Sequence, residues 1–371
     1  GDTPLRARDL ERMGRAGVSV SHCPVNLARR GRSVVLLEAS RLGHRNGSSH
    51  GATRIIRRAY PDEVWDGLID LAYAGWRDVE TSAAATLLTT TGGIFAGTRG
   101  ENGVLRGPGC EEIGVAEARR IAPGLRLGDD MAVVHDPAAG VIDAAGAMRS
   151  LLDLAVRSGV EVRDAAPLQS WEEEDERVIV DTARGTISAA NLVICAGPWI
   201  GWLVPEIADL LRVVRIVNLH LPVGIPDLAP PGLCAFGVEV AGQGLFYGVP
   251  EIGGRGAKVG FDDGPADDLR TPPPPPTEAE LELLLDFARE HLAVGEPTVA
   301  ESLVCRYTMA PGSRFAVGRI PGRRRVLVAA ACSGHGFKFA PAIGEALADL
   351  ALEIERPDLE FIDPTALAAV A

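Results

Sequence analysis

The distribution of apolar and polar residues predicts buried strands and crossover helices at both ends of the chain. Continuous apolar runs at 33–38, 191–197 and 325–331 have the length and composition of parallel strands buried on both faces. Helices are predicted at 62–82, 116–121, 144–158 and 341–355. A further helix reaches Gly31, which is suited to end it because glycine adopts the left-handed C-cap conformation without strain.

The middle of the chain has a different pattern. Residues 205–262 alternate short apolar runs with glycine and proline, which is typical of an antiparallel sheet. Other strands are predicted at 87–96, 160–163, 171–174 and 178–182. Five consecutive prolines make 271–277 an extended surface connector. Thr277 and Glu280 then predict a capping box for a helix that reaches about His291.

The order of these elements predicts the fold class. It is α/β with an α+β insertion: a parallel-sheet, Rossmann-like nucleotide domain and a separate, mainly antiparallel substrate domain. At 371 residues, the chain is long enough for about two domains of the usual ~150 residues. We find no internal repeats.

Charge and composition exclude several functional classes. Acidic residues outnumber Lys and Arg by 50 to 37, and the net charge of −13 argues against nucleic acid as the main partner. No apolar run approaches the roughly 18 residues of a membrane span, and the N-terminal segment is polar and charged. We therefore expect a soluble, cytoplasmic protein. The six cysteines are scattered without a Cys-x-x-Cys pair, so neither a zinc site nor a disulfide framework is indicated.

Two candidate sites lie in the first sixty residues. Glu38 ends a predicted strand, where a dinucleotide fold uses a carboxylate to accept hydrogen bonds from a ribose hydroxyl; a solvated strand end is the commoner alternative. Arg54 and Arg57 are three residues apart and would share a face if this stretch were helical. Two converging guanidiniums can clamp a carboxylate or compensate an anionic ring. Taken alone, the stretch favours a solvated basic segment.

Three further candidates lie in the second half. Lys258 belongs to a glycine-rich, apolar segment; buried, it would be a fixed positive charge or a base with a lowered pKa, although periodicity alone favours a surface lysine. Cys305 can attach a cofactor covalently if its thiolate is accessible, whereas composition alone favours an inert buried thiol. Ser-Gly-His-Gly-Phe-Lys at 333–338 lies between a strand and a helix, where glycines let backbone approach a ligand. A plain tight turn is the alternative for this last segment.

In this order and at these spacings, the groups resemble the monomeric sarcosine oxidase and N-methyl amino acid oxidase family, within the D-amino acid oxidase-like superfamily. The resemblance covers about 25–364, and its most specific segments are 46–57, 305–308 and 333–339. It implies an FAD-binding domain of 1–87, 138–204 and 312–371, with a substrate domain of 88–137 and 205–311. It also implies a monomer that uses FAD and oxygen to oxidise the secondary amine of a small amino acid, giving an imine and hydrogen peroxide.

The resemblance assigns roles residue by residue. It implies that Cys305 forms a thioether with the flavin, that His50 and Arg54 pack against the flavin ring, and that Lys258 promotes the reaction with oxygen. It places Arg57 and Lys338 on the substrate carboxylate. Tyr247 and Asp262 would lie beside the substrate. Glu38, Thr53, Gly334, Gly336 and Phe337 would line the cofactor site. No metal is implied.

Asp262 departs from the family pattern. The sarcosine oxidases carry a histidine at this position that helps to hold the substrate. An acid changes the local charge, so a substrate with an extra cationic or donor group is a hypothesis for this chain. Peroxide release with N-methyl, cyclic and basic amino acids tests it, and activity on sarcosine alone would contradict it.

The N-terminal segment is the second departure. The family begins with an apolar strand and Gly-x-Gly-x-x-Gly, but here Arg15, Gly17 and Val20 fall at the glycine positions and 8–14 reads as a charged helix. Side chains at those positions should obstruct a pyrophosphate. Pro24 falls within the crossover helix, at a cost of about 3 kcal/mol if interior. Residues 3–24 resemble instead a piece of an amidohydrolase; the other metal ligands are missing, so no metal site is assigned to His22.

Three functional readings follow. The first is the FAD-dependent oxidase, with a flavin dehydrogenase that uses another electron acceptor as a variant of it. The second is a non-catalytic relative that binds FAD poorly or not at all, and the third is an amidohydrolase. Bound flavin would favour the first, bound zinc the third, and neither the second. The presence of all five cofactor- and substrate-facing candidates favours the first: Arg54, Arg57, Lys258, Cys305 and Lys338.

Overall fold

The computed structural model describes residues 18–98, 105–330 and 332–368. Its largest element is an eight-stranded sheet. The strand order is β17 (Glu301–Met309), β13 (Arg212–His220), β16 (Lys258–Phe261), β15 (Gly244–Val249), β14 (Ala235–Val240), β4 (Gly93–Thr98), β6 (Met131–Asp136) and β5 (Glu111–Ile113). Neighbouring strands are antiparallel except for β14 and β4, which are parallel. The predicted antiparallel sheet is thus confirmed.

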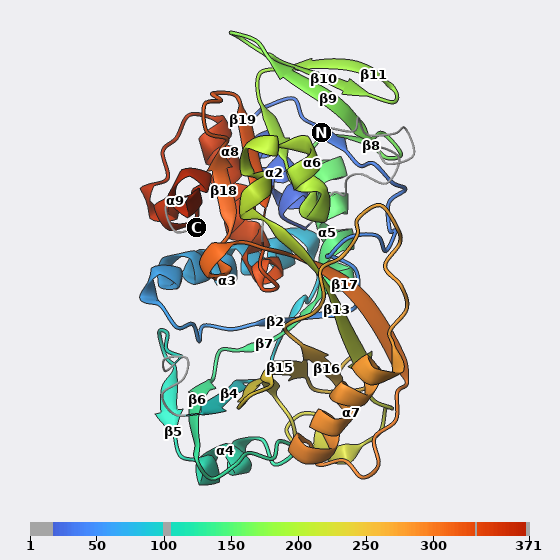
Figure 1. The fold of residues 1–371 in the computed structure, drawn as a ribbon. Coiled ribbons are helices and arrows are strands. Elements are labelled where there is room, and N and C mark those ends of the chain that lie inside the picture. Colours follow the sequence, from blue (N-terminus) through green and yellow to red (C-terminus); the bar gives the residue numbers. More distant parts are fainter. Residues whose placement is uncertain (1–17, 99–104, 331, 369–371) are drawn as a thin grey trace.

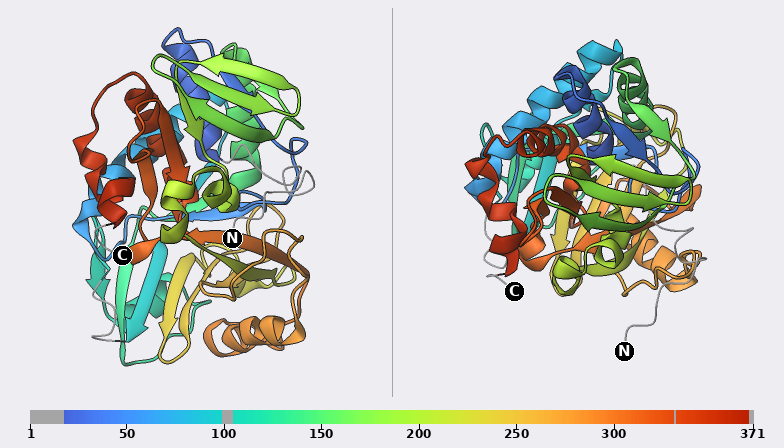
Figure 2. Two further views of the ribbon diagram at one scale, coloured as in Figure 1. Left: turned by 45° about the horizontal axis from the view of Figure 1, so that its top comes forward. Right: turned by 90° about the horizontal axis from the view of Figure 1, so that it is seen from above.

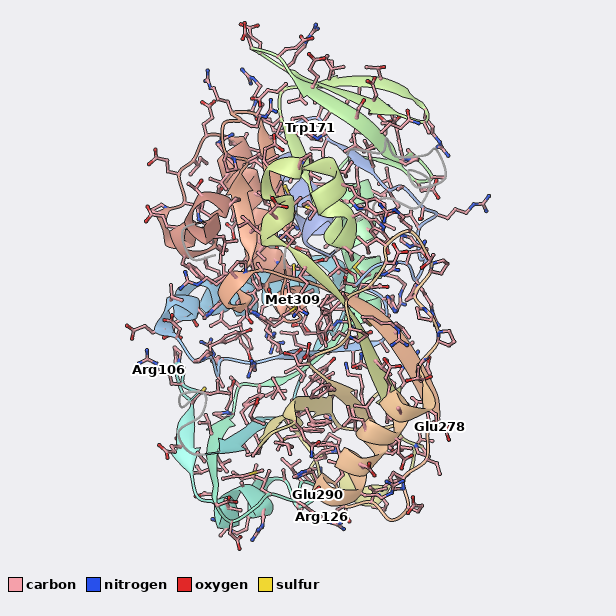
Figure 3. All side chains as sticks on the ribbon, viewed as in Figure 1. Arg106, Arg126, Trp171, Glu278, Glu290 and Met309 are labelled. Atoms are coloured by element: carbon pink, nitrogen blue, oxygen red, sulfur yellow. The ribbon has the colours of Figure 1, made fainter. Side chains whose placement is uncertain are left out.

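Helices cover one end of this sheet. α7 (Glu278–His291) packs its apolar face, including Phe287, on the sheet core beside α4 (Val115–Ile121). Thr277 caps α7 and Glu280 returns the hydrogen bond, so the predicted capping box is present. The backbone N–H of Arg126 donates to the carbonyl oxygen of His291 at 2.7 Å, next to Glu290 at the end of the helix (Figure 3).

The opposite half of the molecule contains the short parallel strands (Figure 1). β1 (Val35–Leu37) pairs with β8 (Glu161–Arg163), and β12 (Leu192–Ile194) pairs with β19 (Val326–Ala330), both in parallel. β18 (Ala316–Arg319) joins β19 antiparallel. The helices here are α2 (Val18–Arg29), α3 (Asp66–Ala83), α5 (Ala144–Arg157), α6 (Ile200–Leu203), α8 (Ala340–Ala351) and α9 (Pro364–Ala368). α2 approaches α8 closely at Gly344, where a Cβ atom would lie 2.7 Å from that of His22.

Two three-stranded sheets complete the fold. β2 (Thr53–Ile56), β7 (Gly140–Asp143) and β3 (Leu88–Thr90) form a sheet in the order β2-β7-β3. The meander β9 (Leu168–Glu173), β10 (Val178–Thr182) and β11 (Gly185–Ala189) lies at the end of the molecule opposite α7 (Figures 1 and 2). Trp171 of β9 donates its indole N–H to the carbonyl oxygen of Leu203 at 2.8 Å, which ties the meander to α6.

Short 3-10 helices connect these elements. They are η1 (Glu63–Trp65), η2 (Gly197–Trp199), η3 (Pro205–Leu210), η4 (Pro226–Leu228), η5 (Pro311–Ser313), η6 (Gly336–Phe339) and η7 (Pro357–Ile362). η6 leads directly into α8, so the predicted glycine turn before a helix is confirmed.

One sequence prediction about local structure was wrong, and one condition left open by the sequence is now decided. The strand predicted at 87–96 is broken into β3 and β4, because Gly92 between them has φ +71°, which a continuous strand does not allow. The sequence left open whether the stretch with Arg54 is helical; it is strand β2, so the two arginines do not share a helix face.

The parallel strands form two separate pairs. Among the described residues, no strand joins β1–β8 to β12–β19. In a doubly wound sheet the first strand lies between these positions. The predicted helix at 8–14 and the glycine positions Arg15 and Gly17 fall outside the described residues; Val20 lies in α2, which also contains Pro24. The predicted division into two domains stays a prediction.

Candidate active site

A cavity of about 100 Å³ lies where β2 and η6 meet the large sheet. Most of the predicted substrate- and flavin-facing residues line it: Arg54, Arg57, Tyr247, Lys258, Asp262, Cys305, Gly334, Phe337 and Lys338. Other lining residues were not predicted: Ile55, Phe95, Asn218, Phe236, Gly237, Leu245, Tyr307 and His335. The sequence contains lysine at positions 258 and 338 and nowhere else. Both lysines of the protein therefore line one cavity.

Lys258 is buried, which overturns the surface position favoured by periodicity alone. Its strand β16 lies between β13 and β15, so its side chain enters the interior and is 6% exposed. The ammonium donates to the carbonyl oxygen of Thr53 at 3.1 Å. Burial, with a smaller effect from Arg54, lowers the pKa of Lys258 to about 7. The Thr53 hydroxyl is buried beside it without a hydrogen-bond partner in the described structure.

The two arginines occupy different positions around β2. Arg54 donates to the carbonyl oxygens of Thr53, Ser48 and His50, and its guanidinium lies 5.2 Å from the ring centre of Phe337. Arg57 lies 4.9 Å from the ring centres of both Tyr60 and Phe95. No described carboxylate forms an ion pair with either guanidinium. The charges of both arginines are therefore not neutralised by a described carboxylate, although Arg54 is already hydrogen-bonded to three backbone carbonyl oxygens.

Lys338 is held by a chain of hydrogen bonds. Its ammonium donates to the carbonyl oxygen of His335 at 2.8 Å and to the hydroxyl of Tyr60 at 3.2 Å. The Nε2 atom of His335 lies 2.9 Å from the carbonyl oxygen of Ser313 and must donate to it. Nδ1 of His335 then accepts from the Tyr60 hydroxyl at 3.2 Å. Burial lowers the pKa of both Lys338 and His335 well below their usual values.

Tyr247, in the middle of β15, and Asp262, directly after β16, are near enough for their charges to interact. The Tyr247 hydroxyl donates to the side-chain oxygen of Asn218 at 2.9 Å and accepts from the Tyr307 hydroxyl at 2.7 Å. The Asp262 carboxylate makes no hydrogen bond or ion pair with any described residue. Burial raises the pKa of Asp262 to about 7, against the opposing effect of Arg57 and Lys338.

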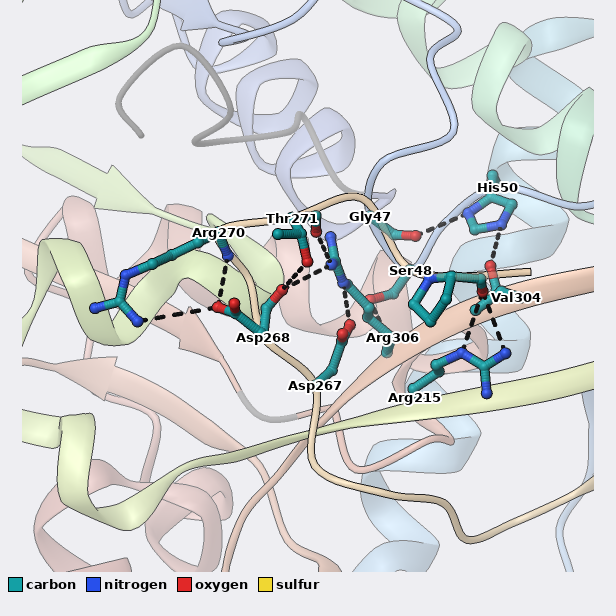
Figure 4. A network of polar contacts seen from close by, with 11 residues as sticks. Gly47, Ser48, His50, Arg215, Asp267, Asp268, Arg270, Thr271, Val304 and Arg306 are labelled. Carbon is teal, nitrogen blue, oxygen red and sulfur yellow. Dashed lines mark hydrogen bonds and ion pairs between the residues drawn. The ribbon is translucent and has the colours of Figure 1, made fainter. Parts of the chain in front are cut away.

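Cys305 lies on β17 beside the loop that carries His50. Its sulfur is 3.7 Å from Nε2 of His50, and the residue is 7% exposed. The loop is attached on both sides of this cysteine, since His50 contacts the carbonyl oxygen of Val304 at 3.0 Å and Ser48 donates to that of Arg306 at 2.5 Å (Figure 4).

Behind this strand, Arg306 forms a buried ion pair with Asp267 and donates to the carbonyl oxygen of Thr271 at 2.7 Å. The proline-rich connector and the His50 loop are therefore fixed to the same strand. Arg215 holds the other end of the connector, because it donates to the carbonyl oxygens of Pro274 and Pro275.

The remaining predicted residues lie outside the cavity lining. Glu38 is buried at the end of β1, where its carboxylate accepts from the backbone N–H of Ser40 at 2.8 Å and lies 3.1 Å from Nε2 of His44. The strand-end acid is therefore not solvated. Gly336 packs on Cys332, where a Cβ atom would meet that side chain at 2.2 Å. His22 is buried beside Asn26, and no described group of three His, Cys, Asp or Glu side chains converges as a metal site.

Comparison with known proteins decides the family. The model of the family described as FAD dependent oxidoreductase (DAO) matches residues 16–350. The chain belongs to this family of FAD-dependent oxidoreductases. The monomeric sarcosine oxidase of Streptomyces avermitilis is 30% identical, with 96% of each chain covered. The peroxisomal sarcosine oxidase of Mus musculus is 28% identical over 91% of each, and the N-methyl-L-tryptophan oxidase of Yersinia pestis is 28% identical over 88% of this chain and 90% of that protein.

Solved structures confirm the fold class. The L-proline dehydrogenase of P. horikoshii superposes with a TM-score of 0.80 at 20% identity, covering 96% of both chains. NikD, an amino acid oxidase of nikkomycin biosynthesis, gives 0.79 at 22% identity, covering 94% of this chain and 95% of its own. The family assignment also limits the amidohydrolase resemblance to a segment that lies largely before the matched residues. No helix in the described part of the chain is long and apolar enough to cross a membrane.

The described residues fit the flavin end of the FAD-dependent family. The hydroxyl of Thr53, which has no hydrogen-bond partner among the described residues, offers a donor to an electron-rich ring, and the guanidinium of Arg54 lies beside it with its positive charge not neutralised by a carboxylate. Gly334 has φ +77°, and a Cβ atom there would lie 2.6 Å from the ring of Tyr307, so only glycine leaves this surface of the cavity open. Glu38, predicted to accept from a ribose, lies buried at the end of β1. The residues expected at the pyrophosphate lie mostly outside the described range.

Proposed function

We propose that this protein oxidises the secondary amine of a small amino acid, such as sarcosine or another N-methyl or cyclic amino acid, with oxygen as electron acceptor. The products are an imine and hydrogen peroxide. The observation that carries this proposal is that Arg57 and Lys338, two cations without an ion-pair partner in the described structure, line the same small cavity as Lys258. This arrangement suits a substrate carboxylate on one side and a cation-assisted reaction with oxygen on the other.

Each residue has a defined task in this proposal. Arg57 and Lys338 bind the substrate carboxylate, and Tyr60 and His335 fix the direction of the Lys338 ammonium. Bound FAD supplies the two-electron oxidation of the substrate. Lys258 places a positive charge where charge develops on oxygen, and low exposure makes that charge more effective. Arg54 and His50 pack against the flavin, and Cys305 is the proposed attachment point.

Acid precipitation tests the cofactor part of the proposal. The purified protein is precipitated with acid and the flavin absorbance is measured in pellet and supernatant. Flavin in the pellet shows a covalent bond; loss of this signal in Cys305→Ser, with Cys110→Ser as a half-buried control outside the cavity, assigns the bond to Cys305. Flavin in the supernatant shows bound but non-covalent FAD.

Peroxide release tests the activity. The holoprotein is supplied with N-methyl, cyclic and basic amino acids, and peroxide is followed by a peroxidase-coupled assay with a catalase-treated control. Substrate-dependent peroxide supports the oxidase. Flavin reduction without peroxide would identify a dehydrogenase instead, and protein that stays colourless after addition of FAD would identify a non-catalytic relative. The observation behind this non-catalytic alternative is that Arg15 and Val20 stand at two of the three glycine positions.

A further inference from the structure

We propose that Asp262 binds the protonated amine of the substrate and accepts its proton, so that the site takes its substrate as a zwitterion. This inference rests on the proposed function. Asp262 is the one carboxylate among the side chains that line the cavity in the described structure. The cavity therefore offers two cations for a carboxylate, Arg57 and Lys338, and one anion for a positive group.

The Asp262 carboxylate does not contribute a polar contact that stabilises the described fold. It forms no hydrogen bond or ion pair with a described residue, although its backbone N–H donates to the carbonyl oxygen of Leu245 at 2.9 Å and fixes its position after β16. Arg57 and Lys338 are near enough to influence its charge, yet neither pairs with it. A carboxylate left without a partner in a desolvated site is costly unless a ligand supplies one.

The carboxylate also faces the turn that carries Lys338. A Cβ atom on Gly334 would lie 3.0 Å from Oδ1 of Asp262, so the carboxylate rests against the backbone four residues before the lysine. A ligand whose carboxylate reaches Lys338 thus places its adjacent amine on the side of Asp262. The small size of the cavity favours this amine over a cation at the end of a long side chain.

The proton balance of the step is simple. An ammonium has no lone pair, and oxidation of the neighbouring C–H bond needs one on nitrogen. The N–H bond breaks, its electron pair stays on nitrogen, and an O–H bond forms on the Asp262 carboxylate. Other groups are less suited, because Tyr247 and Tyr307 already donate their hydroxyl protons to Asn218 and Tyr247, and Lys258 donates to Thr53.

The charge of Asp262 responds to its surroundings. The titratable groups around it come from several elements: Arg57 after β2, Lys338 on η6, Tyr247 on β15, Tyr307 on β17, Glu239 on β14, and Asp263 beside it. Burial raises the pKa of the free carboxyl to about 7, which brings its proton affinity closer to that of an amine than an exposed aspartate would. Binding of an ammonium ligand should therefore weaken as the pH falls through this pKa, because protonation removes the negative charge.

A comparison of isosteric ligands tests the inference. The probes are sarcosine with methoxyacetate, and L-proline with tetrahydrofuran-2-carboxylate, in which oxygen replaces the nitrogen. Between pH 5.5 and 8.5 and without oxygen, the affinity for the oxygen isosteres is measured from the change in flavin absorbance, and the affinity for the amines from the saturation of the rate of flavin reduction. Asp262→Asn should weaken binding of the amines about tenfold or more and remove its pH dependence, while the oxygen isosteres change by less than about twofold. Asp263→Asn, an exposed neighbour whose charge raises the pKa of Asp262, is the matched control: it should keep the preference for amine over isostere and only move the pH dependence to lower pH.

The outcomes separate the inference from the proposed function. Equal losses for amine and isostere in Asp262→Asn would mean that Asp262 only shapes the cavity, and unchanged amine binding would mean that it makes no contact; either result overturns the inference. A selective effect on ligands with a second, side-chain cation overturns it as well. Wild-type protein that binds the amines through Asp262 but never becomes reduced would retain the binding role and refute the oxidase. Protein that binds neither member of either pair refutes both.

Discussion

The hydroxyl of Tyr247 reaches across β16 to the side-chain oxygen of Asn218, 2.9 Å away, over a position that must be glycine. Gly260 is the register partner of both residues, on β15 and on β13. A Cβ atom there would lie 2.4 Å from the Asn218 oxygen and 2.6 Å from the Tyr247 ring. Because Gly260 has no side chain, the hydroxyl of Tyr247 on β15 and the amide of Asn218 on β13 can meet above it in one wall of the cavity.

Gly260→Ala should therefore separate Tyr247 from Asn218. We expect a loss of about 1–3 kcal/mol in stability from overpacking and a clear rise in KM for the amine substrate. Thermal unfolding and steady-state kinetics measure the two effects. Gly295→Ala is the control, since a Cβ atom there meets nothing within 4 Å. Equal behaviour of the two variants would show that the contact between Tyr247 and Asn218 is not needed.

Lys258→Met should slow the oxidative half-reaction but not the reductive half-reaction. Substrate should still reduce the flavin without oxygen, because Arg57 and Lys338 remain, but reoxidation by oxygen should slow by about 10²–10³-fold. Stopped-flow absorbance separates the two steps. Because the pKa of Lys258 is lowered to about 7, its charge is lost as the pH rises through that value, and the oxygen step of the wild type should slow in the same direction. A variant with normal reoxidation would remove Lys258 from this role.

Tyr60→Phe tests the chain that holds Lys338. The ring that packs on Arg57 is kept, while the hydrogen bond to the ammonium and the bond to His335 are lost. Hydrogen bonds to charged groups contribute about 1.5–3 kcal/mol, so KM should rise roughly tenfold or more with a smaller change in kcat. Tyr73→Phe, which removes a hydroxyl bonded to the carbonyl oxygen of Ala138, is the control. Similar KM values in both variants would argue against the chain.

Asp262→Asn should also change stability in a pH-dependent way. The folded pKa of Asp262 is raised to about 7 from an ordinary value near 3.8, so the folded state is favoured while the carboxyl is protonated and loses stability as the pH rises through this window. The variant, which cannot ionise, should melt above the wild type at pH 8 and with it at pH 4, at roughly 2–4 °C per kcal/mol. Calorimetry of ligand-free protein at both pH values decides this, and a constant difference would contradict it.

The sequence predicted a structural feature correctly where the residues that cause it are neighbours along the chain. The capping box of Thr277 and Glu280 and the turn that begins at Ser333 depend on residues a few positions apart, and both are present. The large antiparallel sheet followed from its apolar alternation. The resemblance of three short segments to a known family then predicted that side chains from β2, β16, β17 and η6 share one site, and these side chains line one cavity.

Residues that depend on strand register were missed. Asn218 enters the site because β13 pairs with β16, and no spacing in the sequence predicts that partner. His335 lay inside a recognised motif, but its bond to Tyr60 spans 275 positions. Lys258 was favoured as a surface residue because glycine-rich strands have a weak period, and only the neighbouring strands show that it is buried.

The restriction of lysine to this one cavity has a practical consequence. With no lysine at any other position, side-chain amines are absent from the whole outer surface, and all other strong bases there are arginines. Reagents that modify primary amines can then reach only the chain's α-amine and these two buried groups. Their rate of labelling would report when the cavity opens and when a ligand fills it, without any engineered probe.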